Sequence, residues 1–338
     1  MSQLFKTRIT DLFGIDHPLI CGGLMWLSDA NYVAASVNAG GMGFITAKTF
    51  PDPEAFRAEL QKCRDLTGGK RFGVNLYLSM QPGSNDMLKG HVDIMLSEGV
   101  DIVETAGMPP QDFLGDLKSA GVIINHKVAS IKHAKKAETL GVDAITIVGA
   151  ECGGHPGLDL VGTMVQTAAA AQSLTLPYIV GGGIGHGSQV VAALAMGADA
   201  VVMGSRMTVS EEIWAHRNYK DKVVEASERD TRLIMSSFRN TYRAFDNDDA
   251  RTVSKLESEG VTDYEEYKPY VAGIHQKEAY TSGDWNKGVL SLGQSAVFAT
   301  EVKPVAEIFA DILAEAKAAA ERLDTLRFPN AAAAGRVA

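Results

Sequence analysis

Eight short apolar runs recur through the first two-thirds of the chain, and seven segments with helical periodicity lie between them. The runs are Pro18–Gly23, Gly43–Ala47, Phe72–Leu78, Ile102–Ala106, Val122–Val128, Ala144–Val148, Tyr178–Gly182 and Ala200–Gly204. They are apolar throughout instead of alternating with polar residues, which is typical of parallel strands covered on both faces. Eight strand–helix units in succession predict an α/β protein built as a (β/α)8 TIM barrel.

The residues that end the helical segments support this repeat. A glycine stands shortly before the next apolar run in five places: Gly40, Gly99, Gly121, Gly141 and Gly197. Glycine in this place ends a helix in the left-handed conformation and turns the chain into the strand. An open, doubly wound parallel sheet is the alternative, but the fingerprint GxGxxG of dinucleotide-binding sheets does not occur.

The repeat of strand–helix units ends after Arg206. Residues 207–285 are polar and helical in character and contain no obvious strand, so we expect a helical substrate or lid domain inserted after the eighth strand. Residues 1–206 and 286–325 then form the barrel domain, with closing helices over Gly288–Ala299 and Val302–Leu323. The alanine-rich residues 326–338 are expected to form a flexible tail.

Charge and composition exclude several classes of function. The chain has 32 basic and 41 acidic residues and a net charge of −9, which argues against a nucleic-acid partner. It has no uninterrupted run of 18 apolar residues, so we expect no membrane span. Three cysteines without a CxxC pair predict neither a disulfide framework nor a zinc site. With no apolar signal segment near the start, a reducing cytoplasm is the expected location.

A phosphate site is expected at the ends of the last two strands. In such barrels the active site lies at the carboxyl ends of the strands, and the seventh and eighth often bind phosphate. Glycine lets the backbone approach an anion closely, and both ends are rich in it, which gives the candidates Gly182, Gly183, Gly204 and Ser205. Two merely tight turns are the alternative. Arg206 could pair with the phosphate or serve as a capping charge.

His155 is the candidate catalytic residue. It follows the sixth strand among glycines and a proline, where an imidazole can act as acid, base or anion anchor. Neighbouring Cys152 is a conceivable nucleophile, or a small buried residue. Other polar or open positions at strand ends are Lys127, Asn75, Gly22 and Gly23. No set of metal ligands is recognisable, so we expect no metal.

The motifs, taken in order, resemble the nitronate monooxygenase family, formerly called 2-nitropropane dioxygenases. They are Phe13–Ile20, Gly22-Gly23, Ala39–Gly43, Phe72–Leu76, His126-Lys127, Gly153–Gly157, Gly181–Gly183 and Met203–Arg206. The resemblance implies a TIM barrel that binds FMN and carries a helical domain inserted near its end.

The resemblance also implies roles for single residues. The FMN phosphate would be bound by Gly182, Gly183, Gly204 and Ser205. The flavin ring and ribityl chain would contact Asn75, Lys127 and Gln294, and Gly22 and Gly23 would leave room for the ring. His155 matches the catalytic histidine of the family.

The implied reaction is oxidation of alkyl nitronates by O2 through one-electron transfer to the flavin. Pro156 after His155 is more similar to the quinone-reductase branch. The alternative is therefore an NAD(P)H:quinone oxidoreductase, with NADH or NADPH as co-substrate. Further alternatives are a flavin-dependent enoyl-ACP reductase and a phosphate-sugar aldolase or isomerase that uses Lys127. The sequence is compatible with a homodimer, and it does not assign roles to His186 and Glu104.

Overall fold

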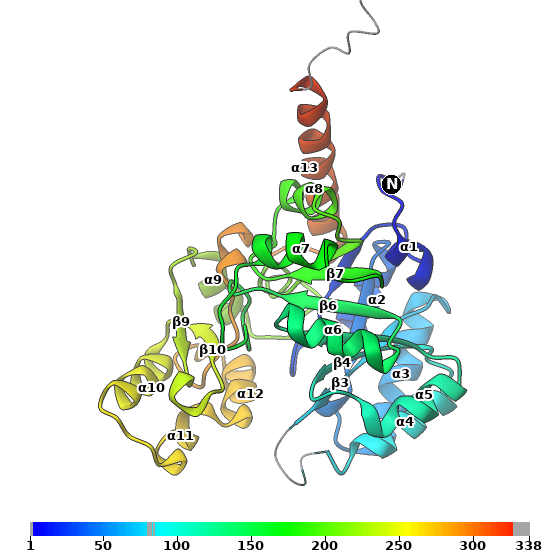
Figure 1. Cartoon of the computed structure of the whole chain (residues 1–338). Helices are drawn as coiled ribbons and strands as arrows, with labels where there is room; N and C mark the ends of the chain where they lie inside the picture. The colour runs from blue at the N-terminus through cyan, green and yellow to red at the C-terminus, as the bar shows by residue number, and fades with distance from the viewer. Residues whose placement is uncertain (1–2, 80–82, 84, 327–338) are drawn as a thin grey trace, which may run out of the picture.

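A closed barrel of eight parallel strands forms the centre of the molecule (Figure 1). The structure is a computed structural model and describes residues 3–79, 83 and 85–326. The strands pair in chain order, and the last pairs with the first. They are β1 Leu19–Cys21, β2 Met42–Thr46, β3 Gly73–Leu78, β4 Ile102–Gly107, β5 Ile123–Val128, β6 Ala144–Val148, β7 Tyr178–Gly181 and β8 Ala200–Met203. Each overlaps its expected apolar run, so the TIM barrel is confirmed and the doubly wound sheet is wrong.

Helices between the strands cover the outside of the barrel. They are α2 Ala30–Asn38, α3 Pro53–Thr67, α4 Leu88–Ser97, α5 Gln111–Ser119, α6 Ile131–Leu140, α7 Thr163–Ala171 and α8 Gly187–Ala195. The five expected glycine exits all have positive φ, from 69° at Gly99 to 103° at Gly197. Residues with a Cβ rarely adopt this left-handed conformation, so glycine at these places lets each helix end within a few residues of the next strand.

Helix α1 (Arg8–Phe13) closes the amino-terminal end of the barrel. Ile9 and Phe13 are fully buried and form one apolar cluster with inward-facing strand residues such as Ile20 and Phe44. The rings of Phe13 and Phe44 meet edge to face with centroids 6.4 Å apart. Because this end is filled, the carboxyl end of the barrel is the face left for a ligand.

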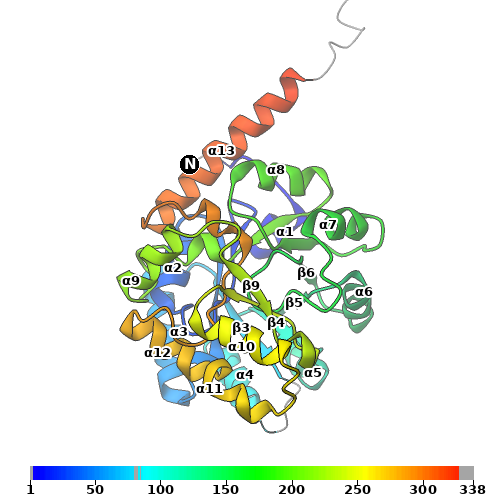
Figure 2. The same cartoon turned by 90° about the vertical axis from the view of Figure 1, so that its left-hand side faces the viewer.

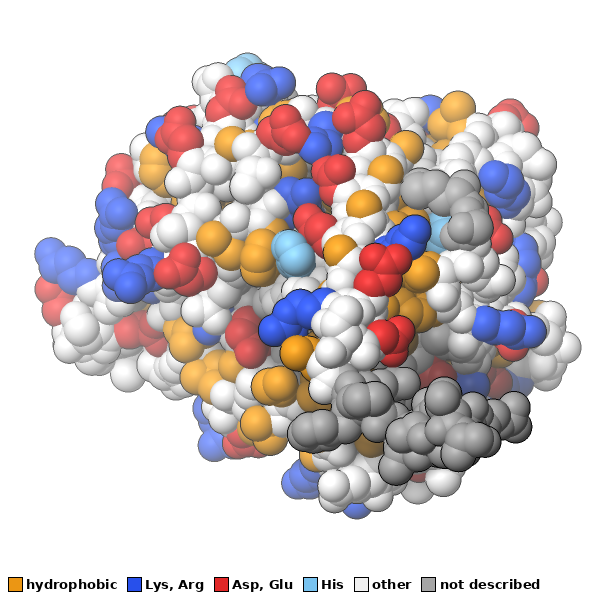
Figure 3. All heavy atoms as spheres, turned by 90° about the horizontal axis from the view of Figure 1, so that it is seen from above, with side chains coloured by type: hydrophobic (Ala, Val, Ile, Leu, Met, Phe, Trp, Pro, Cys, Tyr) orange, Lys and Arg blue, Asp and Glu red, His pale blue; other side chains and the backbone are white. Residues whose placement is uncertain are grey.

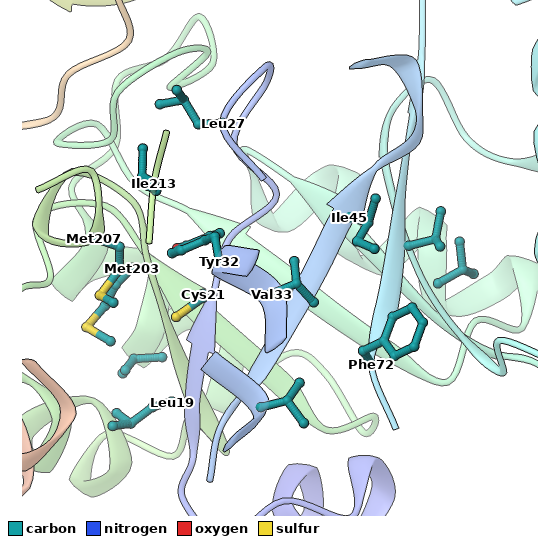
Figure 4. Close-up of a cluster of buried hydrophobic side chains, with 14 of the residues drawn as sticks. Leu19, Cys21, Leu27, Tyr32, Val33, Ile45, Phe72, Met203, Met207 and Ile213 are labelled. Atoms are coloured by element: carbon teal, nitrogen blue, oxygen red, sulfur yellow. The ribbon is translucent and has the colours of Figure 1, made fainter. Parts of the chain in front are cut away.

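A larger core lies between the barrel and its helices. Figure 4 shows part of it beside β1 and α2, where Leu19, Cys21, Tyr32 and Val33 are drawn. All four are buried. This core holds the strands in place from outside, so the inner face near their carboxyl ends is free to carry polar side chains.

The segment after β8 is less helical than expected. It holds α9 (Arg217–Val224), α10 (Asp248–Ser258), α11 (Lys268–Val271) and α12 (Gly273–Ser282). It also holds an antiparallel hairpin of β9 (Thr231–Ile234) and β10 (Tyr242–Phe245). The expectation of no strand within 207–285 is therefore wrong. Strands of four residues are too short for their alternation to be recognised in a polar segment.

The chain returns to the barrel through a short 3-10 turn and one long helix. The turn is Gln294–Phe298, so the helix expected over Gly288–Ala299 is wrong. Helix α13 (Val305–Thr325) confirms the other expected helix and packs on α8 and α2. Its far end projects beyond the barrel (Figures 1 and 2). The expected flexible tail lies outside the described residues except for Leu326.

The insertion lies across the carboxyl end of the barrel (Figure 2). Two isolated backbone pairings attach it there: Gly154 of the loop after β6 pairs with Arg243, and Ala244 pairs with Ser291 of the returning segment. Strand β10 is therefore hydrogen-bonded to both sides of the opening. This attachment makes the insertion part of whatever site the opening contains.

The surface seen from above in Figure 3 mixes acidic and basic side chains without a large patch of one sign. In the described ranges, no helix has the length and apolar character needed to cross a membrane.

Candidate active site

Three polar side chains meet inside the barrel near the carboxyl ends of β3, β4 and β5. Side chains alternate along a strand, and Ile102 packs inside the barrel, so Glu104 also points inward. Asn75 is paired with Glu104 in the register of β3 and β4. Asn125 pairs with Glu104 from the other side, and Lys127 lies two residues further on. The register thus brings Asn75, Glu104 and Lys127 together.

Glu104 is the acceptor that joins this group. Its Oε1 accepts hydrogen bonds of 2.7 Å from the Asn75 amide and of 2.7 Å from the Lys127 ammonium. The Glu104 side chain is fully buried, whereas 20% of the Lys127 side chain is exposed. Oε2 of Glu104 is also buried and has no partner within the described residues. Buried carboxylate oxygens are rarely left unpaired, so this oxygen is available to accept from a ligand hydroxyl or N–H.

Gly204 at the end of β8 borders open space, whereas a Cβ on Gly182 or Gly183 at the end of β7 would meet Thr163 or Glu151. Gly182 and Gly183 have φ of 101° and 71°. A Cβ on Gly204 would meet nothing closer than 3.7 Å. Among the residues that the structure describes, the backbone N–H groups of Gly183 and Ser205 donate to no protein group. Free amides in glycine-rich turns bind anions, so the expected phosphate site has suitable geometry.

Ser205 and Gln294 approach this space from opposite ends of the insertion. The Gly293 N–H donates to Ser205 Oγ at 2.7 Å, and the Gln294 N–H donates to the Glu151 carbonyl at 3.0 Å. A Cβ on Gly293 would lie 2.7 Å from the Gly153 nitrogen, so glycine is required for this approach. The Ser205 hydroxyl keeps its hydrogen for a ligand.

The end of β1 contributes space to the site. The Gly22 N–H donates to the Met203 carbonyl at 3.1 Å, which ties the end of β1 to β8. A Cβ on Gly23 would lie 2.7 Å from the Asn75 Cβ. Gly23 therefore lies beside the polar group and makes room for the Asn75 side chain, and a Cβ on Gly22 would lie 3.2 Å from the Val202 side chain. The role of the two glycines in making room for a flat ring stays a prediction.

Two other basic candidates are directed elsewhere. Arg206 is buried, hydrogen-bonds the Phe298 carbonyl and lies 4.0 Å from Asp311 of α13. His186 is the N-cap of α8 and lies 3.6 Å from Glu315. Both contact the segment that closes the barrel, so each is accounted for by packing between elements.

His155 lies at the mouth of the barrel on the loop after β6. Gly154 and Arg243 hold this loop through two backbone hydrogen bonds of 3.0 and 2.7 Å. The imidazole meets the Tyr242 ring edge to face, with centroids 5.0 Å apart. His155 is exposed at the mouth, yet the neighbouring protein partly desolvates the ring and lowers its pKa below 6.5, with the Asn240 side chain opposing part of this shift. The ring is therefore neutral at pH 7 and can donate one hydrogen bond and accept another.

Tyr242 and Ser291 belong to the site but were not predicted. The Tyr242 hydroxyl is hydrogen-bonded to the Ser291 hydroxyl. Burial raises the pKa of Tyr242, so the phenol keeps its proton at neutral pH. Nothing in the local sequence marks Tyr242, because only the pairing of β10 with the His155 loop brings it there.

The remaining polar groups of the His155 loop are structural. Burial raises the pKa of the Cys152 thiol to about 12, which leaves it protonated and argues against a nucleophile. The Glu151 carboxylate accepts from the Thr163 N–H at 3.0 Å and from the Thr163 hydroxyl at 2.9 Å. Glu151 thus caps the first turn of α7.

The donor and acceptor set fits the parts of FMN. The free amides beside Gly183 and Ser205 suit a dianionic phosphate. Glu104 Oε2 and the Lys127 ammonium suit the hydroxyls and ring carbonyls of a flavin. A Cβ on Gly23 would meet the Asn75 side chain, so glycine at this position lets Asn75 reach Glu104.

Known proteins are similar to this chain over most of its length. The model of the family described as nitronate monooxygenase matches residues 6–315. A (3aS,4S,5R,7aS)-5-hydroxy-7a-methyl-1-oxo-octahydro-1H-indene-4-carboxyl-CoA dehydrogenase of Rhodococcus jostii is 30% identical, over 77% of this chain and 70% of its own. A probable nitronate monooxygenase of Staphylococcus aureus is 26% identical, over 91% and 96%. The solved structure of FabK from Thermotoga maritima has a TM-score of 0.87 and 34% identity, over 96% and 100%.

Replacement of Lys127 by Met should destabilise the fold strongly, because Glu104 would keep a buried charge without its cation. Breaking a buried ion pair in this way costs about 3–5 kcal/mol. Urea unfolding at pH 7 measures the loss. Adding Glu104→Gln to Lys127→Met should restore most of it, and Lys132→Met on the exposed face of α6 is the control. Equal stability of Lys127→Met and the control would contradict the role given to Glu104.

Proposed function

The chain belongs to the nitronate monooxygenase family, and from this membership we propose that it is an FMN-dependent oxidoreductase. Oxidation of an alkyl nitronate by O2 is the first candidate reaction. The observation that carries the proposal is the set of free amides at Gly183 and Ser205, at the same end of the barrel as the buried group of Asn75, Glu104 and Lys127.

In this proposal the chain holds the cofactor from three sides. The glycines after β7 and β8 and the Ser205 hydroxyl bind the phosphate. Lys127, fixed by Glu104, binds the ring or the ribityl chain, and Gln294 adds a contact from the returning segment. When bound, FMN supplies the electron transfer that the protein's own side chains do not provide.

The chain's own residues then bind and orient the substrate. His155 is neutral at pH 7 and donates a hydrogen bond to a nitro or carbonyl oxygen, with Tyr242 fixing the plane of the ring. Lys48 Nζ lies 5.3 Å from the centroid of the Tyr77 ring and, within the described residues, has no carboxylate partner. A partly buried ammonium without an acid beside it suits an anionic substrate such as a nitronate. The insertion covers the opening and excludes water.

A second candidate is a redox reaction of a thioester- or nicotinamide-linked substrate. The Rhodococcus relative is named for a CoA ester, and the relatives with 30% and 34% identity are not named as nitronate monooxygenases. In one form of this reaction, NADH or NADPH reduces the enzyme, and a quinone or an unsaturated thioester accepts the electrons. In the other form, an acyl-CoA is itself oxidised. His155 would bind the carbonyl oxygen in each case.

Ser205→Asp should weaken FMN binding, because it places a negative charge at the proposed phosphate site. Two like charges about 4 Å apart repel by about 4 kcal/mol at an effective dielectric constant of 20, so we expect at least ~100-fold weaker binding. Quenching of flavin fluorescence during titration of the apoprotein gives the dissociation constant. Ser130→Asp, at the N-cap of α6, adds the same charge elsewhere and is the control. Unchanged affinity in Ser205→Asp would place the phosphate at another site.

Anaerobic mixing of the FMN-loaded enzyme with a nitronate, NADH, NADPH or an acyl-CoA should separate the candidate reactions. Loss of flavin absorbance with nitronate alone supports the first candidate. Loss with NADH, NADPH or acyl-CoA supports the second. If no reductant bleaches a fully loaded enzyme, the proposed oxidoreductase activity is wrong.

His155→Gln should lower kcat/KM by at least ~100-fold while FMN remains bound, because the imidazole contacts substrate and not phosphate. The pH profile provides a second readout. The pKa of His155 is lowered from 6.5, so the neutral form predominates at pH 7 and is lost as pH falls through that lower pKa. The wild type should therefore be pH-independent above pH 7 and lose rate on the acid side, whereas the variant should lack this acid limb. His133→Gln on α6 is the control, and an unchanged kcat/KM in His155→Gln would remove His155 from the mechanism.

A further inference from the structure

A second cleft lies beside the mouth of the barrel and is not used by the proposed reaction. It has a volume of about 300 Å³ and lies between the loops after β1 and β2, helix α3 and the insertion. Its walls include the rings of Trp26, Phe50 and Trp214 and the ammonium groups of Lys62 and Lys277. The volume is at the lower end of the range for ligand pockets, ~300–1,000 Å³, so it suits one end of a long ligand.

Trp26 is held in an unfavourable conformation at this cleft. Its φ is 69°, which a residue with a bulky side chain rarely adopts. Its N–H donates to Thr49 Oγ1 at 3.2 Å, and its carbonyl accepts from Trp214 Nε1 at 2.8 Å. The indole N–H of Trp26 is buried and has no partner among the described residues. A strained backbone and an unpaired buried N–H at the same residue are typical of a functional site.

The two lysines of the cleft lack acidic partners. Lys277 Nζ lies over the Trp26 ring, 5.1 Å from its centroid, and neither Lys62 nor Lys277 forms an ion pair within the described residues. The carboxylates at the cleft are already engaged: Asp29 accepts from the Tyr32 N–H and Glu59 from the Ala30 N–H. Both acids thus lie at the first turn of α2, where the helix N-terminus offsets part of their negative charge, and neither pairs with Lys62 or Lys277.

Helix α12 lies between the cleft and the His155 side of the opening and contacts residues of both. Lys277 faces Trp26, while the preceding residue, Gln276, donates to the Tyr280 hydroxyl at 3.1 Å. Tyr280 meets the Trp214 ring edge to face at 6.4 Å. The Gln276 side chain also interacts with Tyr242, the residue that contacts His155. One helix therefore contacts both places through adjacent residues.

We propose that this cleft binds the nucleotide end of a long substrate or co-substrate, with a purine ring against Trp214 and Trp26 and phosphates on Lys62 and Lys277. Indole rings stack on any purine, and lysine ammonium groups bind phosphate as point charges. The reactive end of the same ligand then reaches the mouth of the barrel. This inference rests on the proposed function, and more specifically on its nucleotide-linked substrates. Two ligands share the required chemistry: a CoA thioester, which ends in adenosine 3′,5′-bisphosphate, and NADPH, which ends in adenosine 2′,5′-bisphosphate.

Calorimetric titration of the FMN-loaded enzyme with each adenosine bisphosphate tests the cleft without using the reaction. We expect one isomer to bind with a dissociation constant below ~1 mM. Lys277→Ala and Trp214→Ala should each weaken that binding by at least about tenfold. Lys222→Ala is a matched control, since Lys222 lies over the Trp285 ring at 5.6 Å and outside the cleft. Tighter binding of the 3′ isomer identifies the thioester as the ligand, and tighter binding of the 2′ isomer identifies NADPH.

The proposal is overturned if neither isomer binds at millimolar concentration, or if Lys277→Ala and Trp214→Ala both bind as well as the control. Lys62→Ala gives an independent test should either variant fail to fold. A second readout is kinetic: Lys277→Ala should raise KM for the nucleotide-linked substrate with little change in kcat, and leave KM for a small nitronate unchanged. Flavin absorbance of the same samples distinguishes failure of the nucleotide cleft from failure of the proposed oxidoreductase function. Full FMN reduction without nucleotide binding removes the cleft alone, whereas nucleotide binding to a protein that retains no FMN removes the proposed oxidoreductase.

Discussion

A buried carboxylate inside the barrel sets the arrangement of the site. Glu104 is fully buried on β4, and a charge in that position is tolerated only with hydrogen-bond donors around it. Asn75 and Lys127 supply them from the strands on either side. The pair in turn fixes Lys127, whose head would otherwise be free to move into solvent. The second oxygen of Glu104 has no hydrogen-bond partner within the described residues. A ligand with a hydrogen-bond donor would satisfy this oxygen and would therefore bind favourably inside the barrel.

Most of the barrel could be predicted because its signals are local. The run Ala144–Val148 coincides with β6, and the glycines at Gly40, Gly99, Gly121, Gly141 and Gly197 all have the predicted positive φ. Both signals depend on a few neighbouring residues and on general backbone sterics. The strand ends follow from the same pattern, so it could also be predicted that Lys127 and Gly183 stand at the carboxyl ends of strands.

The parts that escaped prediction depend on contacts distant in sequence. The hairpin of β9 and β10 is short and polar, and it is ordered by pairing with Gly154 and Ser291. Tyr242 has no local mark of function, yet it supports His155. Glu104 was left open because its two donors come from other strands. Likewise, the short turn Gln294–Phe298 replaces an expected helix because Gly293 must pack against Gly153.

The two-sided attachment of β10 also has a consequence for the order of folding. The strands of the barrel are complete in the chain by Met203, but the His155 loop is held by Arg243 and the return segment by Ala244. Strand β10 follows β8 in the chain, so it leaves the ribosome later than every strand of the barrel. A nascent chain that has just released β8 from the ribosome therefore has its barrel strands but not a fixed His155 loop. The His155 loop is fixed only after the insertion has been synthesised and has paired with it.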